Sequence, residues 1–337
     1  MSHPAFSAAT TAEEVASVFT DRIRGKNVLI TGTSINGIGF EAARVLAKYA
    51  NLVIITGYNS ERLKLSQEAI EKDSPTANIR PLTLDLRSLT FVRKAAAEVS
   101  AYPEPLHVGV FIFNLMIPML ISSQVLIHNA YAATAEHQLT EDKLESQMAV
   151  GQIGPFLLTK LLAPKLLAAG TGSYISRVVY VSSMGHALGP GIDLNTVEKG
   201  DPEKYTMMGR HCEVKSANVL SAIELSKRSK GKINGYSLHP GAVITNIIQK
   251  EDRKEALQEF GLLGPDGPPV RRLSGRRFPN LKLPQPFTPE LDVKPGAYFV
   301  DCVEASDKIA PHSSDPETAT KLWTVTEGII GEEFNFE

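Results

Sequence analysis

A chain of 337 residues with 43% hydrophobic and 21% charged residues can bury a large core, which favours one α/β domain with additions. The 35 basic and 37 acidic residues give a net charge of -2 and no field that attracts nucleic acid or anionic lipid, so neither partner is expected. Cys212 and Cys302 lie far apart and lack metal-ligand spacing, so no metal site is expected and a reducing compartment fits best. The N-terminus does not resemble a secretory signal, and residues 1 to about 20 are expected to be a short polar helix and arm in a cytoplasmic protein.

Short apolar runs alternate with helical patterns along most of the chain. Strands are expected at 27–31, 52–57, 79–86, 125–129, 177–182 and 233–238, and helices at 38–49, 61–72, 90–99, 144–167 and 211–228. This order predicts a doubly wound α/β Rossmann fold, a parallel sheet with helices on both faces. We expect a single domain over 1–337 with its core at 26–250.

Two segments depart from this pattern. Residues 108–127 form an uncharged apolar stretch that is long enough to span a bilayer, but it includes polar residues and would pull the fourth strand out of the sheet. Residues 108–124 are interpreted either as translated intron, which sequencing of the cDNA would test, or as an inserted loop. A membrane span ranks below both. Residues 261–290, rich in Pro, Gly and Arg, are predicted to form an irregular loop on the substrate side.

The first strand runs into the motif Thr31-Gly32-Thr33-Ser34-Ile35-Asn36-Gly37-Ile38-Gly39, and a helix follows. Glycines let the backbone turn tightly and approach a pyrophosphate at a helix N-terminus. The motif resembles the TGxxxGxG loop of the short-chain dehydrogenase/reductase family, with one additional residue between Gly32 and Gly37. The subgroup that it resembles best contains retinol-dehydrogenase-like and WW-domain-oxidoreductase-like reductases.

The resemblance implies the other cofactor contacts. No acidic residue ends the second strand. Tyr58 stands where many NADP-dependent relatives have arginine, and Arg62 is the only nearby cation, so NADP is expected over NAD. Asp85 matches the residue that contacts adenine, although a helix N-cap suits its chemistry equally well. Asn129 belongs to an element that resembles NNAG but reads His128-Asn129-Ala130-Tyr131, without its glycine. Val243 and Thr245 match the family's PGxVxT, which holds the nicotinamide carboxamide.

The catalytic set of the family is only partly present. Ser183 is expected to face the substrate carbonyl, and Lys215 to bind the ribose, in a segment that resembles YxxxKxAN. The tyrosine position is His211, and the position of the supporting asparagine is Gly151. His211 and Lys215, four residues apart, share a helix face, but imidazole donates a proton only when charged, and the ammonium of Lys215 lowers its pKa. Tyr180 and Tyr205 do not fall on the helix face of His211 and Lys215, so neither is expected to replace the family's tyrosine.

Two functions follow from these observations. The first is an NADP-dependent oxidoreductase that interconverts an alcohol and a carbonyl on a small, apolar organic molecule, with Ser183, His211 and Lys215 as catalytic residues. The second is a catalytically impaired pseudoenzyme that binds nucleotide or acts as a scaffold. Membrane association is not expected. The sequence leaves open whether the protein forms a homo-oligomer.

Overall fold

The computed structural model describes residues 11–18, 20–104, 125–132, 134–169, 175–240, 294–300 and 303–336. The segment 108–124, the loop 261–290 and two predicted cofactor residues, Val243 and Thr245, lie outside the described residues. Within the described part of the chain, no helix is both long and apolar enough to cross a membrane.

Eight strands form one sheet in the order β3-β2-β1-β4-β5-β6-β7-β8. All neighbouring strands are parallel except the last pair. The strand order reverses between β1 and β4, which is where nucleotides bind in doubly wound sheets. The strands are β1 (Asn27–Ile30), β2 (Leu52–Gly57), β3 (Ile79–Thr83), β4 (Val125–His128), β5 (Ser176–Val181), β6 (Ile233–His239), β7 (Tyr298–Val300) and β8 (Val303–Glu304).

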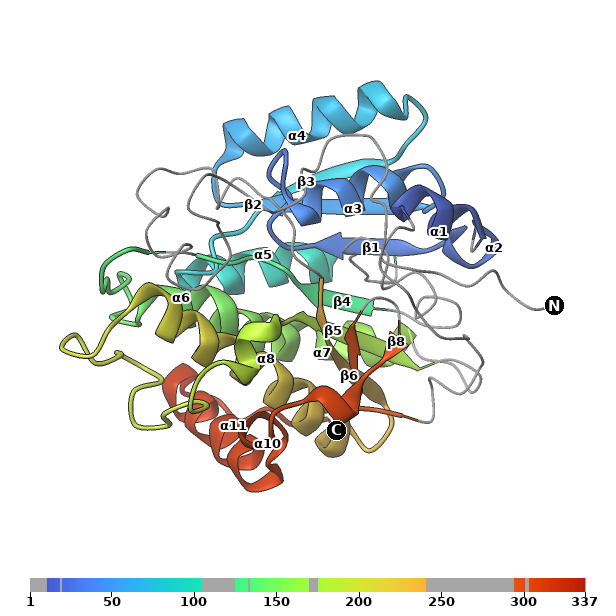
Figure 1. The fold of residues 1–337 in the computed structure, drawn as a ribbon. Coiled ribbons are helices and arrows are strands. Elements are labelled where there is room, and N and C mark those ends of the chain that lie inside the picture. Colours follow the sequence, from blue (N-terminus) through green and yellow to red (C-terminus); the bar gives the residue numbers. More distant parts are fainter. Residues whose placement is uncertain are drawn as a thin grey trace, which may run out of the picture.

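Helices cover both faces of this sheet, so the predicted doubly wound α/β Rossmann fold is confirmed (Figure 1). On one face α1 (Ala12–Val18), α3 (Ile38–Ala47) and α4 (Ser60–Asp73) pack on alternate residues of β1 and β2, and α2 (Thr20–Ile23) follows α1. On the other face lie α5 (Leu89–Ala101), α7 (Gly154–Ala169), α8 (Met207–Ser229) and α11 (Pro316–Ile330). The alternation arises because successive side chains of a strand point to opposite faces.

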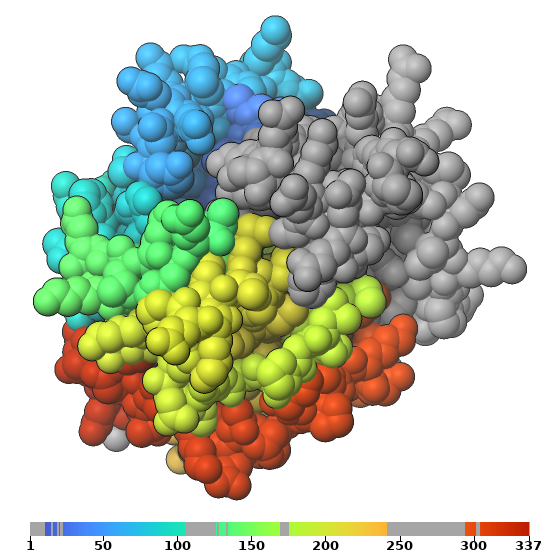
Figure 2. Space-filling model, turned by 60° about the vertical axis from the view of Figure 1, so that its left-hand side comes forward, coloured from blue at the N-terminus to red at the C-terminus, as the bar shows by residue number. Residues whose placement is uncertain are grey.

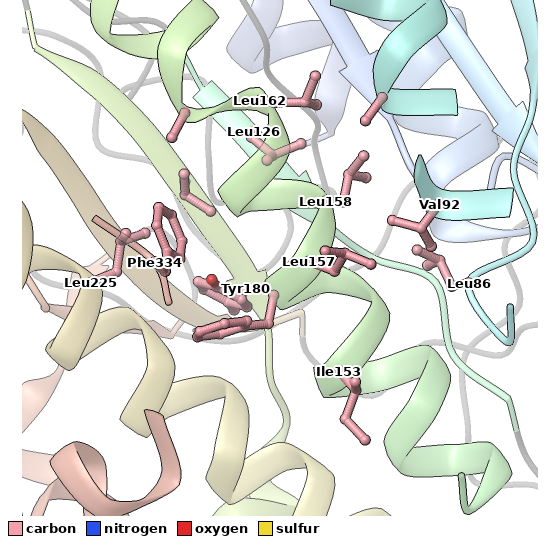
Figure 3. Close-up of a cluster of buried hydrophobic side chains, with 14 of the residues drawn as sticks. Leu86, Val92, Leu126, Ile153, Leu157, Leu158, Leu162, Tyr180, Leu225 and Phe334 are labelled. Atoms are coloured by element: carbon pink, nitrogen blue, oxygen red, sulfur yellow. The ribbon is translucent and has the colours of Figure 1, made fainter. Parts of the chain in front are cut away.

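The core of the second face lies between α7, α8 and the central strands (Figure 3). Leu157 and Leu158 of α7 and Tyr180 of β5 are almost fully buried there. The last helix joins this core through Trp323, whose ring stacks on that of Phe334 at a centroid distance of 5.1 Å. The carboxyl-terminal residues are therefore part of the folded core.

Several boundaries differ from the predicted ones. The helix expected at 144–167 consists of α6 (Ser146–Met148), a π-helical turn η2 (Ala149–Ile153) and α7. The helix expected at 211–228 begins earlier, at Met207, because the hydroxyl of Thr206 accepts a hydrogen bond from the Gly209 amide at 3.0 Å and caps it. Strands β7 and β8 were not expected from the sequence. The remaining short helices are η3 (Met184–Ala187), η6 (Ser306–Lys308) and α10 (Pro311–Ser314).

Candidate cofactor and active site

The glycine-rich loop between β1 and α3 requires residues without side chains. Gly32 has a positive φ of 73°, and a Cβ atom there would lie 3.0 Å from the Ala130 Cα atom. A Cβ atom on Gly39 would lie 2.5 Å from the Gly32 carbonyl oxygen and 2.7 Å from Asn129 Nδ2. The contacts at Gly39 are shorter than real Cβ atoms make, and at Gly32 the positive φ and the tight contact both favour glycine. These glycines therefore let the loop lie tightly against the end of β4.

The additional residue of the loop is accommodated by Asn36, which adopts a left-handed conformation with φ of 60°. Asparagine tolerates this conformation better than most residues. The Gly37 amide donates a hydrogen bond to the Ser34 carbonyl at 2.9 Å and closes the turn. Helix α3 then starts at Ile38 without a side-chain cap. The first backbone amides of α3 are therefore available to hydrogen-bond an anion such as a phosphate.

Asn129 connects the end of β4 to this loop. Its Nδ2 atom donates to the carbonyl oxygens of Thr31 and Gly32 at 3.0 and 3.1 Å, and its own amide donates to Thr31 Oγ1 at 2.9 Å. The side chain that the NNAG-like motif identifies thus supports the shape of the glycine loop.

A pocket of about 220 Å³ lies beside the loop, at the carboxyl end of β2. It brings together the predicted residues Thr33, Tyr58 and Arg62. Thr33 is held there because its amide and hydroxyl both donate to the Thr56 carbonyl at 3.0 Å. The pocket also includes residues that were not predicted to bind the cofactor: Ser34, Thr56, Gly57, Asn59, Leu63 and Ser66. For Asn59 a signal was available, since an asparagine one residue before a helix is a common N-cap, and its Oδ1 atom accepts from the Arg62 amide at 2.9 Å.

Asp85 lies just after the end of β3 and is held by Arg87. The Arg87 Nη2 and Nε atoms donate to the two Asp85 carboxylate oxygens at 2.7 and 3.0 Å. Burial alone would raise the Asp85 pKa, but the hydrogen bonds and charge of Arg87 outweigh it and hold the pKa below its usual range. Asp85 does not cap a helix, because the N-cap of α5 is Ser88.

The Arg87 guanidinium also lies 4.9 Å from the centroid of the Tyr58 ring. The expectation that Arg62 is the only cation near this site is therefore wrong. Arg87 was missed because it follows the third strand, and only the pairing of β2 with β3 brings it beside Tyr58.

Two of the three predicted catalytic residues, Ser183 and His211, lie around Gly185. Ser183 caps the short helix η3 after β5, and α8 carries His211 and Lys215 one turn apart. A Cβ atom on Gly185 would lie 3.2 Å from His211 Nε2 and 3.5 Å from Ser183 Oγ. Ser183 and His211 therefore face the same small space. Ser182 instead donates to the Lys215 carbonyl at 2.7 Å, as expected for a structural serine.

The electrostatics of this site favour neutral imidazole. Burial, followed by the charge of Lys215, lowers the pKa of His211 to about 3. Its Nδ1 atom is buried and has no hydrogen-bond partner within the described part of the molecule. Burial also lowers the pKa of Lys215 to about 8, and its Nζ atom donates to the Val181 carbonyl at 2.7 Å. At pH 7 the pair is therefore an uncharged imidazole beside an ammonium.

Gly151 lies in the π-helical turn η2, where the family has a supporting asparagine. Its carbonyl accepts a hydrogen bond from Asn218 Nδ2 at 2.7 Å. A Cβ atom on Gly151 would lie 2.3 Å from Val214 Cγ1. Val214, one residue before Lys215, thus fills the space that a side chain at position 151 needs.

Tyr131, which motif comparison did not select, completes the site. Its ring meets the His211 ring edge to face, with centroids 4.9 Å apart, and its centroid is 5.2 Å from Lys215 Nζ. Tyr205 does not replace the family's tyrosine, because its hydroxyl donates to the Thr134 carbonyl at 2.9 Å and accepts from Gln147 at 2.7 Å. Tyr180 points into the hydrophobic core (Figure 3).

Comparisons with known proteins agree with this geometry. A family model described as short chain dehydrogenase matches residues 26–191. Short-chain dehydrogenase/reductase prx1 of Penicillium rubens is 30% identical over 319 residues, which are 91% of this chain and 85% of that protein. Retinol dehydrogenase 13 of Mus musculus is also 30% identical, over 92% of this chain and 85% of its own length. The chloroplastic short-chain dehydrogenase TIC 32 A of Brassica napus is 31% identical, over 94% of this chain and 92% of its own length.

A solved structure supports the fold independently. An uncharacterized protein from Mycobacterium paratuberculosis superposes with a TM-score of 0.57 at 24% sequence identity, covering 93% of this chain and 96% of that one. Sheet order, glycine loop and sequence relatives therefore lead to the same assignment. This chain belongs to the short-chain dehydrogenase/reductase family of oxidoreductases, in its retinol-dehydrogenase-like subgroup.

Proposed function

We propose that the protein is a cytoplasmic, NADP-dependent oxidoreductase that interconverts a secondary alcohol and a ketone on a small apolar molecule. The observation that carries this proposal is the convergence of Ser183 and His211 on the space beside Gly185, with Lys215 one helical turn away. This arrangement offers a hydrogen-bond donor for the substrate oxygen and a proton acceptor next to it.

The charges around the pocket support NADP as the cofactor. Among its described lining residues none is acidic, and the Arg62 guanidinium has no ion-pair partner in the part of the chain that the structure describes. Such a cation can pair with the 2′-phosphate that distinguishes NADP from NAD. The amides of Ile38 and Gly39 would hold the pyrophosphate, whereas the Gly37 amide already donates to the Ser34 carbonyl. Asp85 would contact the adenine, and the carboxamide would bind at Val243 and Thr245.

When bound, the nicotinamide ring supplies the hydride acceptor for alcohol oxidation and the hydride donor for carbonyl reduction. In the oxidation direction, Ser183 Oγ would hold the substrate oxygen while neutral His211 Nε2 takes its proton. The ammonium of Lys215 would stabilise the developing negative charge on that oxygen. In the reduction direction His211 would have to be charged, and a pKa of about 3 leaves few such molecules at pH 7. Oxidation is therefore the favoured direction, at a low rate because the base is weak.

A second candidate is a nucleotide-binding protein without turnover. It is favoured by the low pKa of His211 and by Val214, which fills the place of the supporting asparagine. The fold itself is compatible with either function.

One experiment distinguishes the two candidates. NADPH and NADH binding is measured by fluorescence, and turnover is measured with panels of carbonyls and alcohols, for the native protein and for His211→Tyr and His211→Phe. The first proposal predicts that native protein turns over and that His211→Tyr accelerates carbonyl reduction at pH 7 by roughly 100-fold or more, the usual contribution of a positioned general acid. The phenylalanine variant, which has a ring but no hydroxyl, should gain nothing.

Binding without native turnover, restored only by tyrosine, would support the second candidate and reject the first. Equal binding of NADH and NADPH would reject the cofactor assignment alone.

A further inference from the structure

Tyr131 occupies a position in the active site that the proposed function does not use. It is the last residue of the His128-Asn129-Ala130-Tyr131 element and stands where the resembling motif NNAG has glycine. A glycine there has no side chain, so every contact of the Tyr131 ring is a feature of this chain. What these contacts mean for cofactor binding rests on the proposed binding of NADP.

The ring is fixed at its backbone end by the glycine loop. The amides of Asn129 and Ala130 both donate to Thr31 Oγ1, at 2.9 and 3.2 Å. The backbone that carries Tyr131 therefore cannot move far without breaking the connection between β4 and the first turn of the cofactor site.

The ring is also fixed at its hydroxyl end. The Tyr131 hydroxyl donates to Gln147 Oε1 at 2.7 Å, and Gln147 Nε2 donates to the Tyr205 hydroxyl at 2.7 Å. Gln147 itself is fully buried. Tyr205 in turn lies against the segment around Thr134, and Figure 2 shows the green segment 134–145 beside the yellow segment 199–206. This network holds the phenol in one orientation.

Between these two anchors, the ring lies over the residues that the cofactor needs. Its centroid is 5.2 Å from Lys215 Nζ, within the range of a cation–π contact, and 4.9 Å from that of His211. Lys215 is the residue expected to bind the ribose on the nicotinamide side, and its ammonium already donates to the Val181 carbonyl. A ribose that approaches Lys215 from the side of Tyr131 meets the ring first.

We propose that Tyr131 is a gate on the nicotinamide half of the cofactor site, which must swing away from Lys215 before that half can bind. The adenosine half binds at the pocket of Tyr58 and Arg62, which does not include Tyr131. The gate thus weakens binding of the whole dinucleotide and leaves binding of its adenosine half unchanged. If the open form is populated at about one tenth, the apparent Kd for NADPH rises about tenfold.

The test compares NADPH with 2′,5′-ADP, which contains only the adenosine half, by titration calorimetry. Tyr131→Ala should tighten NADPH about tenfold and leave the Kd of 2′,5′-ADP unchanged. Tyr131→Phe keeps the ring over Lys215 and should tighten NADPH less than Tyr131→Ala does. Tyr205→Phe is the matched control: Gln147 keeps its Nε2 hydrogen bond to the Met207 carbonyl at 3.1 Å and still accepts from Tyr131, so the ring stays in place and both affinities should stay within twofold of native.

The remaining outcomes contradict either the gate or the proposed function. If 2′,5′-ADP binds but Tyr131→Ala leaves NADPH affinity unchanged or weaker, the ring is not a gate, and a weaker affinity would make it a platform for the cofactor. If Tyr131→Ala does not fold, Tyr131→Leu replaces it, because leucine also lacks an aromatic ring. If neither native protein nor any variant binds 2′,5′-ADP, the proposed NADP function fails and the gate fails with it.

Discussion

At the scale of single residues, the site differs from the family pattern in positions that depend on one another. Gly151 and Val214 illustrate this: the glycine lacks the expected side chain, and the valine methyl group occupies the space that the side chain needs. Restoring one family residue without changing its neighbour should therefore fail.

We predict that Gly151→Asn destabilises the protein by about 1–3 kcal/mol, the usual cost of overpacking a buried site. Val214 is fully buried, so Val214→Ala is also destabilising on its own. In the double variant the smaller alanine makes room for asparagine, and its free energy of unfolding should exceed the value expected from adding the single changes. Urea denaturation of all four proteins measures this coupling. Simple additivity would show that the two side chains do not compete for space.

At the scale of elements, the β1–α3 turn depends on close backbone contacts more than on side chains. Gly39 is the clearest case, since a Cβ atom there would meet a backbone oxygen of Gly32 at 2.5 Å, and backbone cannot move aside as a flexible side chain can.

We therefore expect Gly39→Ala to shift the loop, to lose about 1–3 kcal/mol of stability and to abolish detectable NADPH binding. Gly328→Ala is a matched control, because Gly328 lies in α11 with no atom within 4 Å of a new Cβ atom. That change should raise stability by up to about 1 kcal/mol, as alanine favours helix over glycine, and leave binding intact. Thermal unfolding measures the stability of each variant, and fluorescence titration measures its affinity for NADPH. Normal NADPH affinity in Gly39→Ala would contradict the role given to the loop.

Elements also show why the sequence predicted some features and missed others. The bounds of β2 are those expected, because its apolar run and flanking turn residues are local signals. The π-helical turn at Ala149–Ile153 has no such signal in the apolar pattern. Arg87 and Tyr131 were missed for a different reason: both reach the site only through the pairing of strands far apart in sequence.

At the scale of the whole molecule, buried neutral histidines couple stability to pH. Burial lowers the pKa of His128 and of His211 to about 3, and burial with the charge of His186 lowers that of His239 to about 4. In the unfolded chain each histidine titrates near 6.5. The unfolded state therefore binds more protons between about pH 6.5 and 4, so stability is fully present above pH 6.5 and falls as the pH decreases through this range.

Each of these histidines contributes a slope of up to about 1.4 kcal/mol per pH unit. His128→Asn removes one of these histidines. We expect it to reduce the slope of the unfolding free energy against pH, between pH 6.5 and 4.5, by up to about 1.4 kcal/mol per pH unit. Urea denaturation at several pH values tests it, with His137→Asn as a control, since His137 is only half-buried. Equal slopes for native protein and His128→Asn would contradict a neutral His128.

By itself the sequence determined the doubly wound fold and predicted the residue types of the candidate site. Hydrophobic periodicity is a local property, and Ser183, His211 and Lys215 fall at motif spacings that one strand end and one helix face impose. Only the tertiary structure decided what surrounds those residues: the Asp85–Arg87 pair beside Tyr58, Val214 in place of a side chain at Gly151, and the Tyr131 ring over Lys215. These contacts join segments separated by tens of residues, and their distances depend on sheet order and packing, which no local pattern specifies.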